Sequence, residues 1–371
     1  MKYYVIAGEA SGDLHGANLL KHLYALDVQA EIRCWGGDKM QHTGATLVKH
    51  FRDLAFMGFT EVLKNLPTIL RNMAFCKQDI VQFAPDVLVL VDYPGFNLRI
   101  ANWAKTQGIR VVYYIAPQVW AWKPNRVKAM KQSIYELLTI LPFETNYFKN
   151  QWNWAVTYVG HPLVQVVKEA KQTTPTSLST KPIIAVLPGS RKQEISKKLP
   201  IMLAVAKHFT NYQFIVAKAP GLDDSFYEPF MLGYSNVTTV SNQTYALLMQ
   251  SSAALVTSGT ATLETALFKV PQIVCYKTSS ISYEIGKRLI KIPYISLVNL
   301  IMNQLVVKEL IQHALTEENI TKELSQLLNN QAYQQEVLQK YDALEQNLLQ
   351  DVDASLLAAQ RVVNAAQTLT S

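Results

Sequence analysis

Short apolar runs separated by helix-like segments restrict the fold of this 371-residue chain more than any other feature. Strands that are apolar on both sides, with helices between them, predict a parallel sheet covered on both faces. The first run is followed by a glycine-rich turn and a helical stretch from Leu14 to Leu26. In the first half of the chain, strands are predicted at residues 3–7, 87–91, 111–116, 136–141 and 155–159.

A second series of apolar runs predicts a second sheet of the same kind. Between the two series, residues 171–182 are rich in Thr, Ser and Pro, which is typical of a linker or an exposed loop. We therefore expect two doubly wound α/β units with their boundary near this segment. The strands of the second unit are predicted at residues 183–187, 214–217, 237–240, 253–256 and 272–276.

The carboxyl end is expected to be helical, because no Gly or Pro occurs after Pro293 and apolar residues recur at helical spacing. Asp353 suits the N-cap of the last helix. This helix should pack on its own domain, on the first domain or on another subunit. Its predicted apolar face consists of Leu356, Ala359, Val363 and Ala366.

Composition excludes several classes of protein. With 49% hydrophobic and 17% charged residues, the chain is not intrinsically disordered. Its three distant Cys residues, without a C-x-x-C or HExxH pattern, argue against a disulfide framework or a zinc site. The amino terminus lacks the apolar core of a signal peptide, and no run approaches the ~20 apolar residues of a membrane helix. We expect a cytoplasmic protein.

The net charge of +7 favours an anionic partner. Nucleic acid, a phosphorylated substrate and an acidic membrane surface all have the required charge. No RNP, helix-turn-helix or zinc signature accompanies the scattered Lys and Arg residues, so nucleic-acid binding is not expected.

The first candidate site is the turn GEASGDLHG at residues 8–16. A glycine-rich turn between a strand and a helix lets backbone N–H groups approach an anion. Its glycine spacing matches neither the dinucleotide-binding fingerprint nor the Walker A motif. The alternative is a tight connection in which Ser11 or Asp13 caps the helix and His15 packs in its first turn.

Asp92 directly follows the five apolar residues of the strand at 87–91. Ligands of open α/β sheets bind outside the carboxyl ends of the strands. Apolar neighbours raise the pKa of a carboxyl group, which would make Asp92 a better acceptor for a hydroxyl proton. The alternative is that Asp92 caps the loop or helix that follows.

The segment LPGSRKQEI, residues 187–195, combines a Pro-Gly-Ser turn with Arg191. Arginine makes charge-assisted, often bidentate contacts with phosphate, so this turn suits a phosphate site. The alternative is an exposed turn in which Arg191 is only solvated.

The segment at 255–271 passes from a buried strand through Ser258, Gly259 and Thr260 into a helix. The amino end of such a helix can hold a diphosphate without a metal. Glu264, about one turn further on, suits hydrogen bonds to the two hydroxyls of a ribose. The alternative is a capping box between Glu264 and the start of the helix.

The amphipathic segment at 57–75, and WAWKPNRVKAMK at 120–131 with its two Trp residues beside several cations, suit an anionic membrane interface. The alternative is ordinary core packing. The residues expected to contact the membrane or acyl chains are Val62, Leu63, Leu66, Ile69, Leu70 and Met73.

These motifs, taken in order, resemble the lipid-A-disaccharide synthase family of Gram-negative bacteria. Each string alone is weak, but their order and spacing together are highly specific, and they cover nearly the whole chain. The motifs are GEASGD, MGFTEVL, the PDV strand that ends at Asp92, PQVWAW, LPF, VGHPL, LPGSR, SGTATLE, and ISLVNLI with VKEL.

The resemblance implies a GT-B type fold, in which two doubly wound Rossmann-like domains face a cleft and a helical carboxyl-terminal segment follows. Residues 1–165 would form the acceptor-binding domain with the membrane-facing stripe. Residues 166–345 would bind the UDP-sugar. Residues 346–371 would form a terminal helix that packs back on the first domain or is exchanged with a second subunit.

The resemblance also implies an activity. Members of the family transfer 2,3-diacylglucosamine from UDP-2,3-diacylglucosamine to 2,3-diacylglucosamine 1-phosphate with inversion, which forms the β-1,6-linked lipid A disaccharide 1-phosphate and UDP. No metal or other cofactor is expected. The expected partners are lipid substrates at the inner face of the cytoplasmic membrane and, in a homodimer, a second copy with exchanged carboxyl-terminal segments.

By this resemblance, Asp92 is the candidate general base for the 6-hydroxyl of the acceptor. The acceptor is expected to contact Ser11, Gly12, Asp13 and His15. The nucleotide-sugar is expected to contact Gly189, Ser190, Arg191, Ser258, Gly259, Thr260, Thr262, Glu264 and Asn299.

Two positions depart from the family pattern. Gly95 stands where the family often has an acidic residue, and Leu305 stands where many members have the acidic member of an Arg-Glu pair. The contacts of those acidic residues cannot be transferred to this chain.

Two alternative functions fit the same architecture. One is a UDP-N-acetylglucosamine 2-epimerase, which needs neither an acyl acceptor nor a membrane. The other is a catalytically degenerate, membrane-peripheral UDP-sugar binding protein, which the presence of Asp92, Arg191 and Glu264 makes less attractive.

Overall fold

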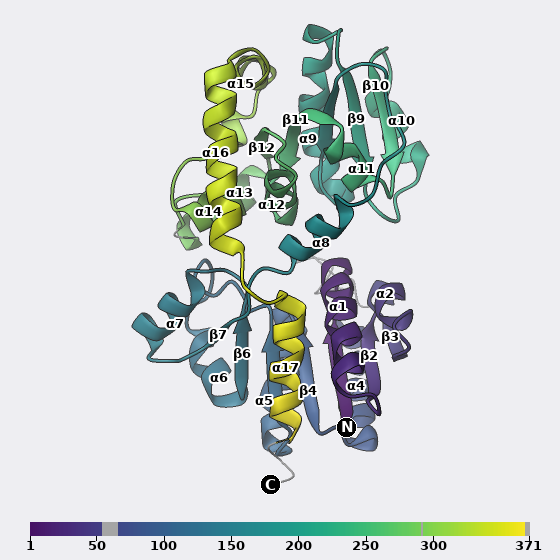
Figure 1. Cartoon of the computed structure of the whole chain (residues 1–371), viewed down its shortest axis with the longest axis vertical. Coiled ribbons are helices and arrows are strands. Elements are labelled where there is room, and N and C mark those ends of the chain that lie inside the picture. The colour runs from purple at the N-terminus through teal and green to yellow at the C-terminus, as the bar shows by residue number, and fades with distance from the viewer. Residues whose placement is uncertain (54–65, 291, 368–371) are drawn as a thin grey trace. The chain divides into compact units, whose positions relative to one another are not determined.

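The computed structural model describes residues 1–53, 66–290 and 292–367 (Figure 1). By its internal contacts the chain forms two compact units. Unit 1 comprises Met1–Pro162 together with Gln350–Ser371, and unit 2 comprises Leu163–Leu349.

Unit 1 contains a seven-stranded parallel sheet in the order β3-β2-β1-β4-β5-β6-β7. Its central strands β4 and β1 are buried, β4 along its whole length and β1 from Tyr3 to Ala7, as expected for a sheet covered on both faces. The strands are β1 (Lys2–Ala7), β2 (Glu31–Gly36), β3 (Thr46–His50), β4 (Val87–Val91), β5 (Val111–Tyr114), β6 (Glu136–Thr139) and β7 (Thr157–Tyr158). The helices are α1 (Ala10–Leu26), α2 (Asp38–Gln41), α4 (Leu66–Phe83), α5 (Pro94–Thr106), α6 (Arg126–Ser133), α7 (Glu144–Trp152) and α17 (Ala354–Gln367).

Unit 2 contains a six-stranded parallel sheet in the order β10-β9-β8-β11-β12-β13. The strands are β8 (Ile183–Leu187), β9 (Gln213–Lys218), β10 (Val237–Ser241), β11 (Ser251–Thr257), β12 (Gln272–Tyr276) and β13 (Lys308–Ile311). The helices are α8 (Leu163–Ala170), α9 (Lys192–Ala204), α10 (Asp224–Met231), α11 (Thr244–Met249), α12 (Thr260–Leu267), α13 (Ser280–Leu289), α14 (Leu297–Met302), α15 (Glu317–Asn329) and α16 (Gln331–Leu348).

The two doubly wound units confirm the predicted fold class, but some predicted details are wrong. The carboxyl end was expected to be entirely helical, but it contains the edge strand β13. This strand was not predicted because Lys308 and Glu309 interrupt its apolar pattern. Of the two possibilities given for residues 171–182, the exposed loop is confirmed, and it lies inside unit 2 rather than between the units. Lys171 Nζ donates to the Leu267 carbonyl at 2.7 Å, and the Leu178 amide donates to Gln250 Oε1 at 3.0 Å.

Helix α17 belongs to unit 1, where it packs on α1 although the two are far apart in sequence (Figure 1). Asp353 caps it as predicted, because its Oδ1 accepts hydrogen bonds from the amides of Ser355 and Leu356, both at 2.9 Å. Arg361 Nε also donates to Glu136 Oε1 at 2.5 Å. The chain therefore returns to its first sheet after completing the second.

Candidate functional site

In unit 1, the chain changes direction across the sheet between β1 and β4, which are neighbours. From β1 it continues to β2 and β3 on one side, and from β4 to β5, β6 and β7 on the other. Such a switch point leaves a crevice at the carboxyl ends of the two strands, where ligands of open α/β folds bind. The residues that follow these strands are Gly8 and Asp92.

Asp92 is held by its backbone. Its carbonyl accepts hydrogen bonds from Asn97 Nδ2 at 2.8 Å and from the Tyr113 hydroxyl at 2.5 Å. Asp92 and Tyr93 both have left-handed backbone conformations, with φ of 47° and 52°. Two successive non-glycine residues in this region cost energy, and such strain is concentrated at functional sites.

The carboxyl group of Asp92 does not cap helix α5, so that part of the alternative is wrong, whereas its hydrogen bond from the Tyr93 amide agrees with a cap of the following loop. The N-cap position of α5 is Tyr93, and it has no side-chain cap. Burial raises the pKa of Asp92 to about 6, although a hydrogen bond from the Tyr93 amide acts in the opposite direction. Asp92 is therefore mostly ionised at neutral pH and is a stronger base than an exposed aspartate.

The loop after β1 lies directly against the loop after β4. A Cβ atom on Gly8 would lie 2.2 Å from Cδ1 of Tyr93, so only glycine fits there while Tyr93 keeps its place. The Tyr93 ring stacks on Phe96 at a centroid distance of 5.8 Å. The glycine-rich turn therefore serves the close approach of two loops.

The predicted roles of the GEASGD residues need correction. Helix α1 already begins at Ala10, so neither Ser11 nor Asp13 caps it. Asp13 is buried, and its carboxylate accepts hydrogen bonds from the amides of Gly37, Lys39 and Met40 at 2.7, 3.1 and 3.0 Å. These bonds anchor the start of α2, so the expected contact of Asp13 with the acceptor is wrong.

Ser11 is exposed at the start of α1, and Gly12 is buried against Ala7 of β1. His15 is buried beside His161, whose pKa it helps to lower. Burial lowers the pKa of His15 to about 4 and that of His161 to about 3, so both rings are neutral at physiological pH. Nδ1 of His15 is buried and has no hydrogen-bond partner among the described residues.

Glu144 is a buried carboxyl group that the sequence reasoning missed. It accepts hydrogen bonds from Trp120 Nε1 at 3.1 Å and from the amides of Ile140 and Leu141 at 3.2 and 3.0 Å. Burial raises the pKa of Glu144 to about 7, and the charge of Asp92 adds to this. Its position directly after the LPF motif was the available signal.

In unit 2, the corresponding switch point lies between β8 and β11. Gly189 and Gly259, in the loops that follow these strands, have φ of 113° and 137°, which side chains rarely adopt. Within the described residues, the amides of Gly189, Ser190, Gly259 and Thr260 donate no hydrogen bond to the protein. The two loops therefore present unpaired N–H groups at one edge of the sheet.

Arg191 occupies the N-cap position of α9, and its side chain is 56% exposed. Its guanidinium lies 3.3 Å from Glu194 Oε1. Arg191 therefore lies at the end of the loop that follows β8, beside the positive amino end of α9.

Lys198 is a second cation at this edge, and the sequence reasoning missed it. Its side chain is only 2% exposed, and its Nζ contacts the hydroxyl of Thr257 at the end of β11. A Cβ atom on Gly189 would lie 3.6 Å from this Nζ, and the carboxylate of Glu194 lies 3.9 Å away. Burial lowers the pKa of Lys198. An anion bound by the loop would compensate this buried charge.

Several predicted nucleotide contacts are used inside the protein. Ser258 Oγ donates to the Ile295 carbonyl at 2.7 Å. Thr262 is fully buried, and its hydroxyl donates to the Gly259 carbonyl at 2.8 Å. The proton of each hydroxyl is therefore used inside the protein, and the predicted contacts of Ser258 and Thr262 with the nucleotide-sugar stay predictions.

Glu264 does not form the capping box considered as an alternative. The N-cap of α12 is Gly259, which has no side chain, and Glu264 Oε1 instead accepts a hydrogen bond from the Tyr245 hydroxyl at 2.8 Å. Burial raises the pKa of Glu264. Glu264 keeps a second carboxylate oxygen for a ligand hydroxyl.

Asn299 cannot make the expected side-chain contact with the nucleotide-sugar. It is 0% exposed, and its Nδ2 donates to the Val307 carbonyl and to Glu309 Oε1, both at 2.9 Å. Its Oδ1 accepts from the amides of Val306 and Val307 at 2.8 and 2.9 Å. All four hydrogen-bonding positions of the amide are filled, so Asn299 holds the 306–309 segment in place.

The predicted membrane stripe is only partly within the described residues, since Val62 and Leu63 lie outside them. Leu66 begins α4. Met73 is buried in the core of unit 1, which contradicts its expected contact with a membrane, and Ile69 is half-buried. The exposed apolar side chains of α4 include Leu70, Phe75 and Val81.

The described residues contain neither a membrane-spanning helix nor a cluster of metal ligands. No helix among them is long and apolar enough to cross a membrane. No three of their His, Cys, Asp or Glu side chains are grouped so that they could hold a metal ion.

Comparison with known proteins gives matches over nearly the whole chain. The family model for lipid-A-disaccharide synthetase matches residues 3–361. A lipid-A-disaccharide synthase of Trichlorobacter lovleyi is 36% identical over 339 residues, which cover 89% of this chain and 88% of the relative.

Solved structures support the fold at low sequence identity. The UDP-GlcNAc 2-epimerase of Neisseria meningitidis bound to UDP-GlcNAc has a TM-score of 0.64 at 13% identity, with both chains covered completely. The glycotransferase of kitacinnamycin has a TM-score of 0.69 at 12% identity and covers 98% of this chain and 99% of its own. These likenesses show the GT-B type of fold, whereas the family model and the sequence identity place the chain in the lipid-A-disaccharide synthase family.

Proposed function

We propose that this chain is an inverting glycosyltransferase of lipid A biosynthesis. It moves 2,3-diacylglucosamine from UDP-2,3-diacylglucosamine to 2,3-diacylglucosamine 1-phosphate, which yields the β-1,6-linked lipid A disaccharide 1-phosphate and UDP. The observation that carries the proposal is the half-buried Asp92 at the switch point of unit 1, with its raised carboxyl pKa, in a chain that matches the family over residues 3–361.

Unit 1 supplies the acceptor chemistry. Asp92 accepts the proton of the 6-hydroxyl while the oxygen attacks the anomeric carbon of the donor and the bond to the UDP oxygen breaks. The anchored backbone carbonyl of Asp92 supports this role, because its two hydrogen bonds fix the residue that carries the base.

Unit 2 supplies the donor chemistry. Binding of a UDP-sugar is supported by family membership and by the fold shared with an epimerase bound to UDP-GlcNAc. The unpaired amides after β8 and β11, together with Arg191 and Lys198, suit the charge that develops on the departing diphosphate. With these donors we propose that the transfer needs no metal.

The enzyme is proposed to work as a peripheral protein on the inner face of the cytoplasmic membrane. Exposed Leu70, Phe75 and Val81 on α4 support contact with acylated substrates. We also propose a homodimer that exchanges carboxyl-terminal segments. In such a dimer, α17 of a second copy would take the place on α1 that the chain's own α17 occupies in this structure.

The experiment that tests the function offers radiolabelled 2,3-diacylglucosamine 1-phosphate and a panel of UDP-sugars to the purified chain, with and without a chelator. We expect labelled disaccharide only with UDP-2,3-diacylglucosamine, and equal turnover with chelator. Turnover of unacylated UDP-N-acetylglucosamine without a labelled product would instead favour the epimerase. Loss of turnover with chelator would contradict the metal-free reaction alone.

A further inference from the structure

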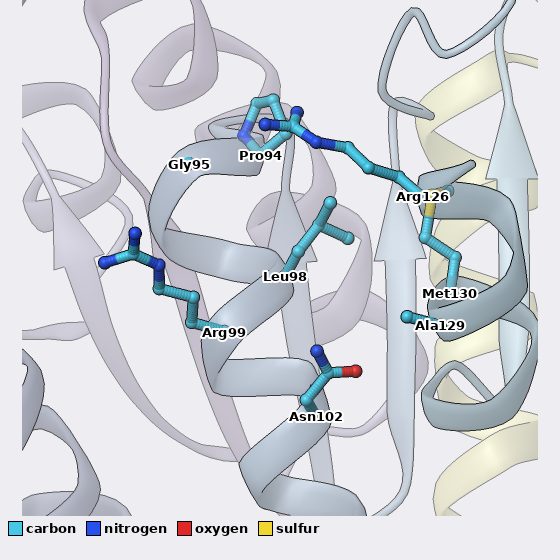
Figure 2. Close-up of a pocket in the computed structure, with 8 residues that line it drawn as sticks. All are labelled: Pro94, Gly95, Leu98, Arg99, Asn102, Arg126, Ala129 and Met130. Atoms are coloured by element: carbon cyan, nitrogen blue, oxygen red, sulfur yellow. The ribbon is translucent and has the colours of Figure 1, made fainter. Parts of the chain in front are cut away.

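A pocket of about 240 Å³ opens between α5 and α6 in unit 1, beginning two residues after Asp92 (Figure 2). None of its residues has a role in the site described above. The pocket is lined by Pro94, Gly95, Leu98, Arg99, Asn102, Arg126, Ala129 and Met130.

The pocket contains two arginines that have no carboxylate partner among the described residues. The ion pairs formed by arginine within the described residues involve other arginines and include neither Arg99 nor Arg126. Figure 2 shows Arg126 reaching from the start of α6 towards Pro94 at the start of α5. The Arg99 guanidinium points to the side of α5 away from α6 (Figure 2), so Arg126 is the arginine placed for bidentate binding of an oxyanion in the pocket and Arg99 is a second cation of the lining.

The backbone adds a further donor. The amides of Phe96 and Asn97 donate to the Tyr93 carbonyl at 3.3 and 3.0 Å, whereas the amide of Gly95 donates to no carbonyl of the described residues. Gly95 lies in the first turn of the 13-residue helix α5, whose amino end is positive. Gly95 is exposed and has no side chain that could repel an anion.

Four other titratable groups of unit 1 that were described above do not attract an anion. Asp92 and Glu144 are carboxyl groups, and His15 and His161 are neutral at physiological pH. Arg126 is nevertheless close to the reaction centre, because the Tyr113 hydroxyl bonded to Asp92 feels the charges of both Asp92 and Arg126. A phosphate near Asp92 would find its cations in this pocket.

The remaining lining suits an amphiphile. Leu98 and Asn102 project from α5 on the side that faces α6, where Met130 lies (Figure 2). An amide and apolar side chains beside two guanidinium groups fit a sugar phosphate with acyl chains better than a free inorganic ion.

We propose that this pocket binds the phosphate of the acceptor, with Arg126 as its cationic ligand, Arg99 as a second cation of the lining and the Gly95 amide as a further donor. This assignment rests on the proposed function. It makes the pocket the element that distinguishes a phosphorylated acylated amino sugar from its unphosphorylated form.

The test compares Arg126→Met and Arg99→Met with the control Lys128→Met, which removes an exposed cation of α6 outside the pocket. Transfer is measured to 2,3-diacylglucosamine 1-phosphate and to 2,3-diacylglucosamine. We expect Arg126→Met to raise KM for the phosphorylated acceptor by about 10- to 100-fold with little change in kcat, which is the range for a charged hydrogen bond. KM for the unphosphorylated acceptor should not change, and Arg126→Lys should recover part of the loss.

Binding of glucosamine 1-phosphate and of glucosamine by calorimetry gives a second readout that does not depend on turnover. If the wild-type chain binds glucosamine 1-phosphate, the Arg126 variant does not, and no transfer occurs, the result would support the pocket and contradict the proposed function. Arginine variants that keep the wild-type preference for phosphate in both assays would overturn the pocket. Arg126-dependent binding to phosphatidylglycerol vesicles without binding to glucosamine 1-phosphate would also overturn it, in favour of a lipid headgroup.

Discussion

Replacing Asp92 with Asn should separate proton abstraction from donor binding. A positioned general base contributes about 10²- to 10⁴-fold to a rate, so turnover should fall by that amount. The affinity for UDP should stay within about twofold, because the phosphate-binding loops belong to unit 2 and lose no donor. Turnover is measured by UDP release and affinity by calorimetry.

The pH profile gives a second magnitude. Asp92 must be ionised to accept a proton, and burial raises its pKa from 3.8 to about 6. The ionised fraction is then roughly 90% at pH 7 and roughly 10% at pH 5. kcat/KM of the wild type should therefore fall on the acid side with a midpoint near 6, and this limb should be absent in the Asn variant.

Asp86→Asn provides the matched control. Asp86 stands at the opposite end of β4, where its Oδ2 accepts a hydrogen bond from the Lys2 amide at 2.7 Å, and the Asn variant keeps an oxygen for that bond. This variant should show wild-type turnover and the same acid limb. The reasoning is refuted if Asp92→Asn turns over at the wild-type rate, or if the wild-type limb has its midpoint near pH 4.

Three further predictions concern residues whose roles emerge from the structure. Lys198→Met should weaken UDP binding about tenfold in calorimetry without changing uridine binding. The control Lys197→Met removes an exposed neighbouring cation and should change neither affinity. Equal effects of the two variants would contradict the role of Lys198 in binding the diphosphate. Glu144→Ala leaves three donors without an acceptor and should lower the free energy of urea unfolding by about 3 kcal/mol. Wild-type stability of this variant would contradict the structural role of Glu144. Asn299→Ala removes four buried hydrogen bonds and should also lower the free energy of urea unfolding by about 3 kcal/mol. A variant with unchanged stability that no longer binds UDP would show that Asn299 contacts the nucleotide directly.

The sheets were predictable because their central strands are buried on both faces and are therefore apolar without interruption. β4 shows this in its sequence VLVLV, and the position of Asp92 after it follows from the general rule for such sheets. β2 and β13 were not predicted because charged residues interrupt their apolar pattern. Their extended conformation depends on pairing with the neighbouring strands β1 and β12.

The site was less predictable, because the use of a polar side chain depends on partners far away in the sequence. Asp13 and Asn299 lie in the motifs expected to bind substrates, but their hydrogen bonds go to the amides of residues 37–40 and 306–307. Lys198 shares the buried face of α9 with Ile195 and Met202, so helical periodicity separates it from the exposed Lys197. Only the tertiary structure shows that its Nζ lies close to Gly189 of the loop after β8.

The linkage in the product tests the central claim most directly. The purified chain is incubated with UDP-2,3-diacylglucosamine and 2,3-diacylglucosamine 1-phosphate, and the purified lipid is analysed by NMR. The account predicts one new β-1,6 glycosidic bond for each UDP released. An α-linked product, a bond to another hydroxyl, or UDP release without a disaccharide would contradict it.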